Sequence, residues 1–132
     1  MDSAQAVTTL AGLRAPIGAG AWLMPRVAGR LFGLDVGGNP QAPYLARLFG
    51  IRDLALAAGA VQSRGEARRL WLRIGIACDA ADAAAGLLAG RAGYLPKVST
   101  VLVTVPALAG IALGVIALRG ETGPGAAAQP VG

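Results

Sequence analysis

The sequence predicts an all-α, polytopic membrane protein whose four transmembrane helices form an up-down bundle. Two observations favour this fold class. Hydrophobic residues make up 55% of the 132 residues and charged residues only 14%, so the chain is more apolar than a soluble domain of this size. In addition, the charges cluster between long apolar blocks, whereas a water-exposed helix repeats its charges with helical period along one face.

Four apolar blocks are the expected spans. At a rise of about 1.5 Å per residue, blocks of this length suit a hydrocarbon core about 30 Å thick, although the first is barely long enough. The first block ends at Pro25 and Arg26, and a cluster of Gly, Pro and Asn residues separates it from the second. The predicted spans are residues 8–24, 44–61, 70–89 and 98–118, within a transmembrane domain of residues 1–119.

The two ends of the chain have separate predictions. Residues 120–132 are mostly Gly, Pro and Ala and have little to bury, which predicts a disordered C-terminal tail. Short loops force successive helices to run antiparallel, so both termini are expected on one side of the membrane. Arg14 can extend toward that side, which favours a multi-pass cell-membrane protein with cytoplasmic termini.

Five charged residues fall inside the expected spans: Arg14, Arg52, Asp53, Asp79 and Asp82. Counting outward from the loop between the second and third blocks places Arg52 and Asp79 at similar depth and predicts an ion pair between them. An unpaired charge at the bilayer centre costs at least about 2.5–3.5 kcal/mol, so these groups must be paired, protonated or hydrated. Three carboxylates face two guanidiniums, and burial would raise the pKa of an excess acid. The cluster is therefore either a structural ion network or a functional site.

Small residues share helix faces with these charges. On the third block, glycine recurs along the stripe that carries Asp79 and Asp82, and small residues let helix backbones approach closely. Such faces are expected to point inward, away from lipid. The glycines predicted to pack against other helices are Gly75, Gly86, Gly90, Gly110 and Gly114.

Three segments resemble a known group of proteins. They are "ARLFGIRDLALAAGA", "GIACDAADAAAGLLAG" after one short loop, and the step Met24, Pro25, Arg26 before "GRLFGL". Together they are similar to a family of small four-helix integral membrane proteins of actinobacteria, over residues 12–118. This resemblance implies four helices, the plasma membrane and a bacterial origin, and it implies no activity.

Composition excludes several function classes. The net charge of +5 does not indicate nucleic-acid binding, because the basic residues form no stripe with interleaved aromatics. Histidine is absent and Cys78 is the single cysteine, so no zinc site, cysteine–histidine nucleophile or cofactor motif is present in the sequence, and we expect no metal and no cofactor.

The remaining interpretation is an accessory or interaction protein of the lipid bilayer, with a homodimer or a partner membrane protein as further partners. Its polar centre would hold the bundle together and bind a partner helix or a small ligand. The alternatives are a dimeric proton-coupled small transporter and an acid–base enzyme acting on a lipid-like substrate through its aspartates. An enzyme is the less favoured of the possibilities, since two acids on one helix face more often share an arginine than a substrate.

Overall fold

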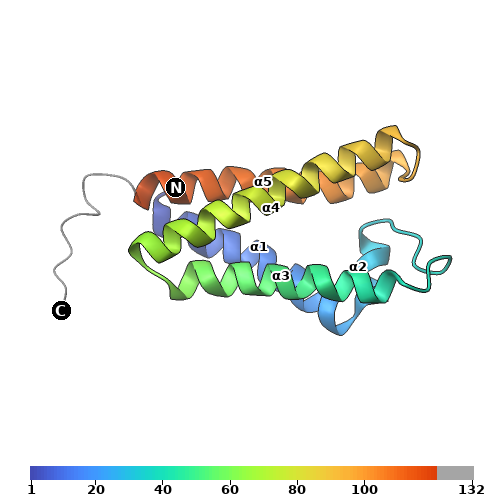
Figure 1. Cartoon of the computed structure of the whole chain (residues 1–132), viewed down its shortest axis with the longest axis horizontal. Coiled ribbons are helices and arrows are strands. Elements are labelled where there is room, and N and C mark those ends of the chain that lie inside the picture. The colour runs from blue at the N-terminus through green and yellow to red at the C-terminus, as the bar shows by residue number, and fades with distance from the viewer. Residues whose placement is uncertain (122–132) are drawn as a thin grey trace.

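The computed structural model describes residues 1–121, and all of its regular structure is α-helical. The five helices are α1 (Ser3–Leu23), α2 (Pro25–Leu31), α3 (Ala42–Gln62), α4 (Gly65–Arg91) and α5 (Lys97–Glu121). Successive long helices (α1, α3, α4 and α5) run in opposite directions. The start of the chain and the end of α5 therefore lie at the same end of the molecule (Figure 1). The predicted disordered tail lies outside the described residues from residue 122 onward.

Local sequence signals explain several helix boundaries. Asp2 caps α1, because its Oδ1 accepts the backbone N–H of Gln5 at 2.7 Å while the Gln5 side chain accepts the N–H of Asp2 at 3.0 Å. Pro25 opens α2, where its missing N–H costs nothing. Gly33 follows α2 with φ of 71°, a left-handed conformation that glycine adopts without strain.

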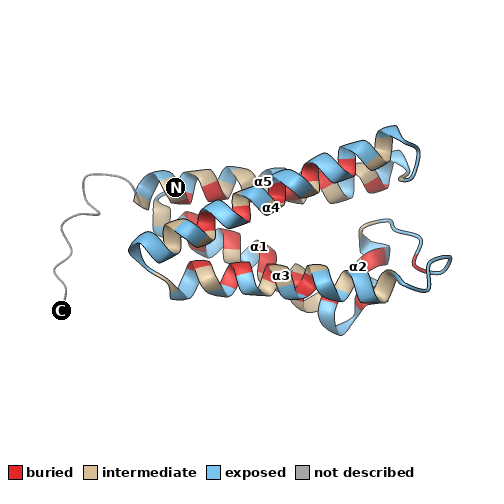
Figure 2. Cartoon of the chain, viewed as in Figure 1, coloured by how far each residue is buried: buried red, intermediate tan, exposed pale blue. Residues whose placement is uncertain are grey.

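The helices form two lobes that diverge along the molecule. The first lobe contains α1, α2 and α3, and the second contains α4 and α5 (Figure 1). At the end where the chain starts, the lobes share a small apolar core: Ala6, Val7, Leu10, Ala60, Leu72 and Ala117. Buried residues continue along the facing sides of the helices (Figure 2). At the opposite end the Ser99 hydroxyl donates to the Gly33 carbonyl at 2.6 Å, which links α5 to the end of α2.

The predicted packing glycines all lie against another helix or its side chains. A Cβ atom at four of them would come within 3.0 Å of a side chain on a different helix, and at Gly75 it would lie 3.0 Å from one. The facing side chains are Arg14 for Gly75, Thr104 for Gly86, Thr100 for Gly90, Asp79 for Gly110 and Ile76 for Gly114.

The prediction of a four-span membrane bundle is wrong. Within residues 1–121, only α5 combines the length and the apolar composition needed to cross a membrane. The reason is charge and polarity along the other helices: α3 contains Arg47, Arg52 and Asp53, and α4 contains seven charged residues. The multi-pass localisation is corrected with it. By length and composition, one helix is compatible with a membrane location.

Candidate functional site

The five predicted charged residues come together between the lobes. α1 contributes Arg14, α3 contributes Arg52 and Asp53, and α4 contributes Asp79 and Asp82. Arg14 Nη2 lies 2.5 Å from Asp79 Oδ2, and the Arg52 guanidinium contacts both oxygens of Asp82, at 2.5 and 3.0 Å. Asp53 Oδ1 lies 3.5 Å from each arginine, so it joins the two pairs into one network of two cations and three acids.

The predicted partner of Arg52 is wrong. Arg52 pairs with Asp82, one turn beyond Asp79 on α4, and Asp79 pairs with Arg14 instead. Counting residues from a loop estimates depth along two consecutive helices, but it does not show which cation a third helix brings closer. Here α1 places Arg14 against Asp79, and Arg52 contacts Asp82, one turn further along α4.

The network has an inner and an outer part. The side chains of Arg14, Asp53 and Asp79 are 5%, 7% and 8% exposed, whereas those of Arg52 and Asp82 are 33% and 28% exposed. The inner part therefore lies in a region of low dielectric, where an ionic contact is strong and an unpaired charge is costly.

Burial changes the protonation of the inner acids. It raises the pKa of Asp79 to about 6, against the attraction of the Arg14 guanidinium, which acts in the opposite direction. Burial also raises the pKa of Asp53, and its two weak contacts with Arg14 and Arg52 oppose the shift only in part. The inner acids therefore hold their protons more tightly in the folded protein than in the unfolded chain.

This difference predicts how stability depends on pH. Because the pKa of Asp79 is about 6 when folded and 3.8 when unfolded, the folded state binds more protons between these values. The free energy of unfolding is expected to fall as pH rises through this window, by up to about 3 kcal/mol from this residue. Urea denaturation at pH 4 to 7.5 measures it. Asp79→Asn should flatten the decline, and equal pH profiles for the two proteins would contradict the assignment.

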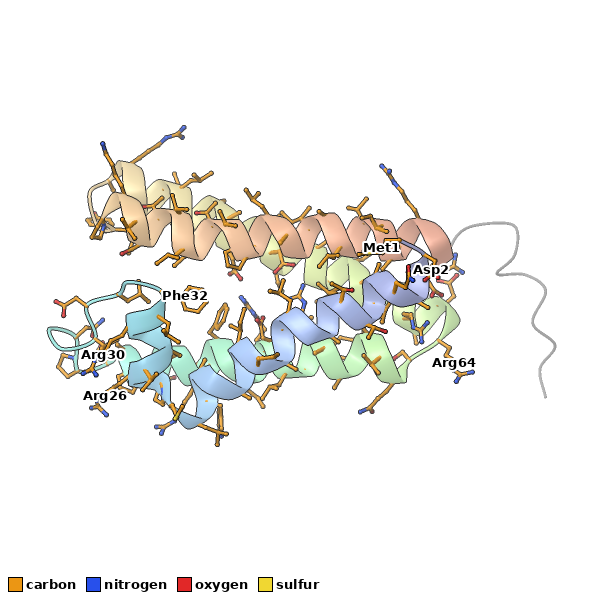
Figure 3. The ribbon with its side chains drawn as sticks, turned by 180° about the vertical axis from the view of Figure 1, so that it is seen from behind. Met1, Asp2, Arg26, Arg30, Phe32 and Arg64 are labelled. Atoms are coloured by element: carbon orange, nitrogen blue, oxygen red, sulfur yellow. The ribbon has the colours of Figure 1, made fainter. Side chains whose placement is uncertain are left out.

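A cleft of about 600 Å³ extends from the charged network toward the diverging end of the lobes. All five helices contribute to its walls, which are mostly apolar, and Arg14, Asp53, Asp79 and Asp82 line its inner end. Phe32 extends from the end of α2 toward the space between the lobes (Figure 3). Sequence reasoning missed the cleft, because its wall residues are ordinary Ala, Leu, Val and Phe positions with no pattern that separates them from core.

Two carboxylate oxygens at this inner end have no hydrogen-bond donor within residues 1–121. The contacts of Asp53 go to its Oδ1 and the hydrogen bond of Asp79 goes to its Oδ2. Asp53 Oδ2 and Asp79 Oδ1 therefore remain as acceptors on two residues that line the cleft. Across the described chain, no group of three or more His, Cys, Asp or Glu side chains is arranged to hold a metal ion.

Comparisons of this chain with protein-family models, curated proteins and solved structures found no match. No comparison supports the resemblance to the actinobacterial membrane family, and the four membrane spans that it implied are contradicted, because only α5 within residues 1–121 could cross a membrane.

Proposed function

We propose that this protein binds a small amphiphilic molecule in the cleft between its lobes. The observation that supports the proposal is the combination of an apolar cavity of about 600 Å³ with charged groups gathered at one end. Small-molecule sites typically have this composition, with apolar walls that supply affinity and a few polar groups that fix orientation. This proposal specifies the accessory role predicted from the sequence as the binding of a small ligand.

The charged network suits a polar head group better than it suits stability alone. Burying the carboxylates of Asp53 and Asp79 is costly, and Asp53 lies no closer than 3.5 Å to either arginine. The unused acceptors Asp53 Oδ2 and Asp79 Oδ1 offer hydrogen bonds to a ligand that donates them. An amphiphile would cover the apolar walls with its body and satisfy these acceptors with its head.

A membrane is the proposed source of the ligand. The outward side of α5 exposes Val98, Val101, Val105 and Leu108, each more than half accessible. Such a contiguous apolar face suits contact with lipid. Tyr94 precedes this face in the loop before α5, and tyrosine favours the boundary between lipid and water. The homodimer and the partner membrane protein stay predictions.

Acid–base catalysis remains a second proposal. Asp79 lines the cleft and its pKa of about 6 suits proton transfer near neutral pH. Recovery of a chemically altered amphiphile after incubation would favour it over binding alone. The transporter alternative required acids buried within several membrane spans, whereas only α5 within residues 1–121 could cross a membrane.

The test is equilibrium binding of tritiated 1-dodecanol, an uncharged amphiphile, to the protein in lipid nanodiscs, with empty nanodiscs as background. Ala85 lines the cleft and Ala84, its neighbour on α4, is exposed and lies outside it. We expect saturable binding that Ala85→Trp weakens about tenfold or more by filling the cleft, while Ala84→Trp leaves it within about twofold. Uptake equal to that of empty nanodiscs, or equal loss in both variants, would overturn the proposal.

A further inference from the structure

A second, wholly apolar groove adjoins the cleft. It has a volume of about 400 Å³ and lies between α1, α2 and α5. Four residues line both spaces: Ile17, Ala28, Phe32 and Pro106. The groove contains no charged residue in its lining, so it suits hydrocarbon and offers nothing to a polar group.

The shared lining defines a route for a long ligand. One end is the charged network on α1, α3 and α4, and the other is the apolar groove, with Phe32 in the lining of both spaces. A molecule with a polar head and one flexible chain fits such a route. A rigid fused-ring molecule would fill the cleft without entering the groove.

The charge balance at the inner end selects the sign of the head group. Arg14 is engaged by Asp79 and Arg52 by Asp82, each at 2.5 Å, while Asp53 meets both arginines only at 3.5 Å. One more positive charge would bring the network to neutrality. The Asp53 side chain is only 7% exposed, so little water reaches its carboxylate to take the place of a cationic partner.

Resting on the proposed function, we infer that the ligand is a single-chain cationic amphiphile. Its ammonium head lies against Asp53 Oδ2 and Asp79 Oδ1, and its alkyl chain continues past Phe32 into the apolar groove. An ammonium donates three hydrogen bonds and suits two carboxylate acceptors. An anionic head would instead add a charge beside three carboxylates.

The head group is tested with tritiated dodecylamine and 1-dodecanol on the protein in nanodiscs of neutral lipid at pH 7.5. We expect the amine to bind about tenfold or more tightly than the alcohol, and Asp53→Asn to reduce that preference below about threefold by weakening amine binding more than dodecanol binding. Asp79→Asn should reduce it in the same way. Asp35→Asn removes a carboxylate from the exposed loop at the edge of the cleft and should preserve the preference.

The position of the ligand's alkyl chain is tested by comparing amines with alkyl chains of different length. Leu102 lines the apolar groove and not the cleft, whereas Leu108 is exposed on the same helix and lines neither. Leu102→Trp should remove most of the gain of dodecylamine over octylamine, and Leu108→Trp should preserve it.

The outcomes separate the two proposals. If dodecanol binds but the amine has no advantage, the cationic head group is overturned and the binding function stands. If Asp35→Asn removes the advantage and Asp53→Asn does not, the position of the head group at Asp53 and Asp79 is overturned. If Leu102→Trp leaves the length dependence unchanged, the route into the groove is overturned. If neither compound binds above empty nanodiscs, the binding function fails as well.

Discussion

Replacing Arg14 with methionine is expected to lower the free energy of unfolding by about 3–5 kcal/mol, because it leaves buried acids without their cation. Arg14 is 4% exposed and is the arginine that contacts both Asp79 and Asp53. Methionine keeps much of the side-chain volume, so the loss reports charge and hydrogen bonding more than packing. Urea denaturation of the purified protein in mild detergent at pH 7.5 measures it.

Arg52→Met is the matched control. The Arg52–Asp82 pair is about one-third exposed, so its loss is expected to cost about 1 kcal/mol or less. Adding Asp79→Asn to Arg14→Met should recover part of the larger loss, since the double variant no longer buries an unpaired Asp79 charge. Equal losses for the two arginine variants would show that the inner and outer pairs do not differ in the way their burial indicates.

Replacing Gly18 with leucine is expected to separate α1 from α3 and to destabilise the protein by about 3 kcal/mol or more. A Cβ atom at Gly18 would lie 2.8 Å from the carbonyl oxygen of Gly50, and one at Gly50 would lie 2.6 Å from that of Gly18. Both obstacles are backbone atoms, which cannot move as a side-chain end can. This crossing therefore requires glycine on both helices.

Gly12 provides the comparison on the same helix, because no atom of another element lies within 4 Å of a Cβ placed there. Gly12→Leu should be neutral or stabilising, by up to about 1 kcal/mol, from improved helix propensity alone. Thermal unfolding of both variants measures the difference. A Gly18→Leu protein as stable as Gly12→Leu would contradict the close crossing of α1 and α3.

The sequence predicted the positions of the helices better than it predicted whether lipid or protein surrounds them. Apolar blocks at residues 44–61 and 98–118 correspond to α3 (Ala42–Gln62) and α5 (Lys97–Glu121), because block edges coincide with capping and turn residues. The interpretation of residues 44–61 as a membrane span was wrong, because α3 carries Arg47 in addition to Arg52 and Asp53, and three charges are more than a spanning helix of this length tolerates. Composition alone does not distinguish a helix that spans a membrane from one that packs against other helices.

For the candidate site, too, the sequence predicted features within one helix but not the contacts between helices. Helical spacing predicted that Asp79 and Asp82 share a face with small residues, and the structure places both against arginines. Spacing within one helix could not assign the partners, because that depends on how α1 and α3 lie relative to α4. The cleft depends on the divergence of the lobes, which no local pattern encodes.

Photolabelling is the most direct test of the cleft as a binding site. A dodecanol analogue with a diazirine on its chain would be bound to the protein in nanodiscs, irradiated, and mapped by mass spectrometry of the peptides. We predict labels on both lobes, at wall residues such as Phe32 and Val103, that excess unlabelled dodecanol removes. Labels confined to the outward face of α5, at residues such as Val101 and Leu108, and unaffected by competitor would contradict the binding function.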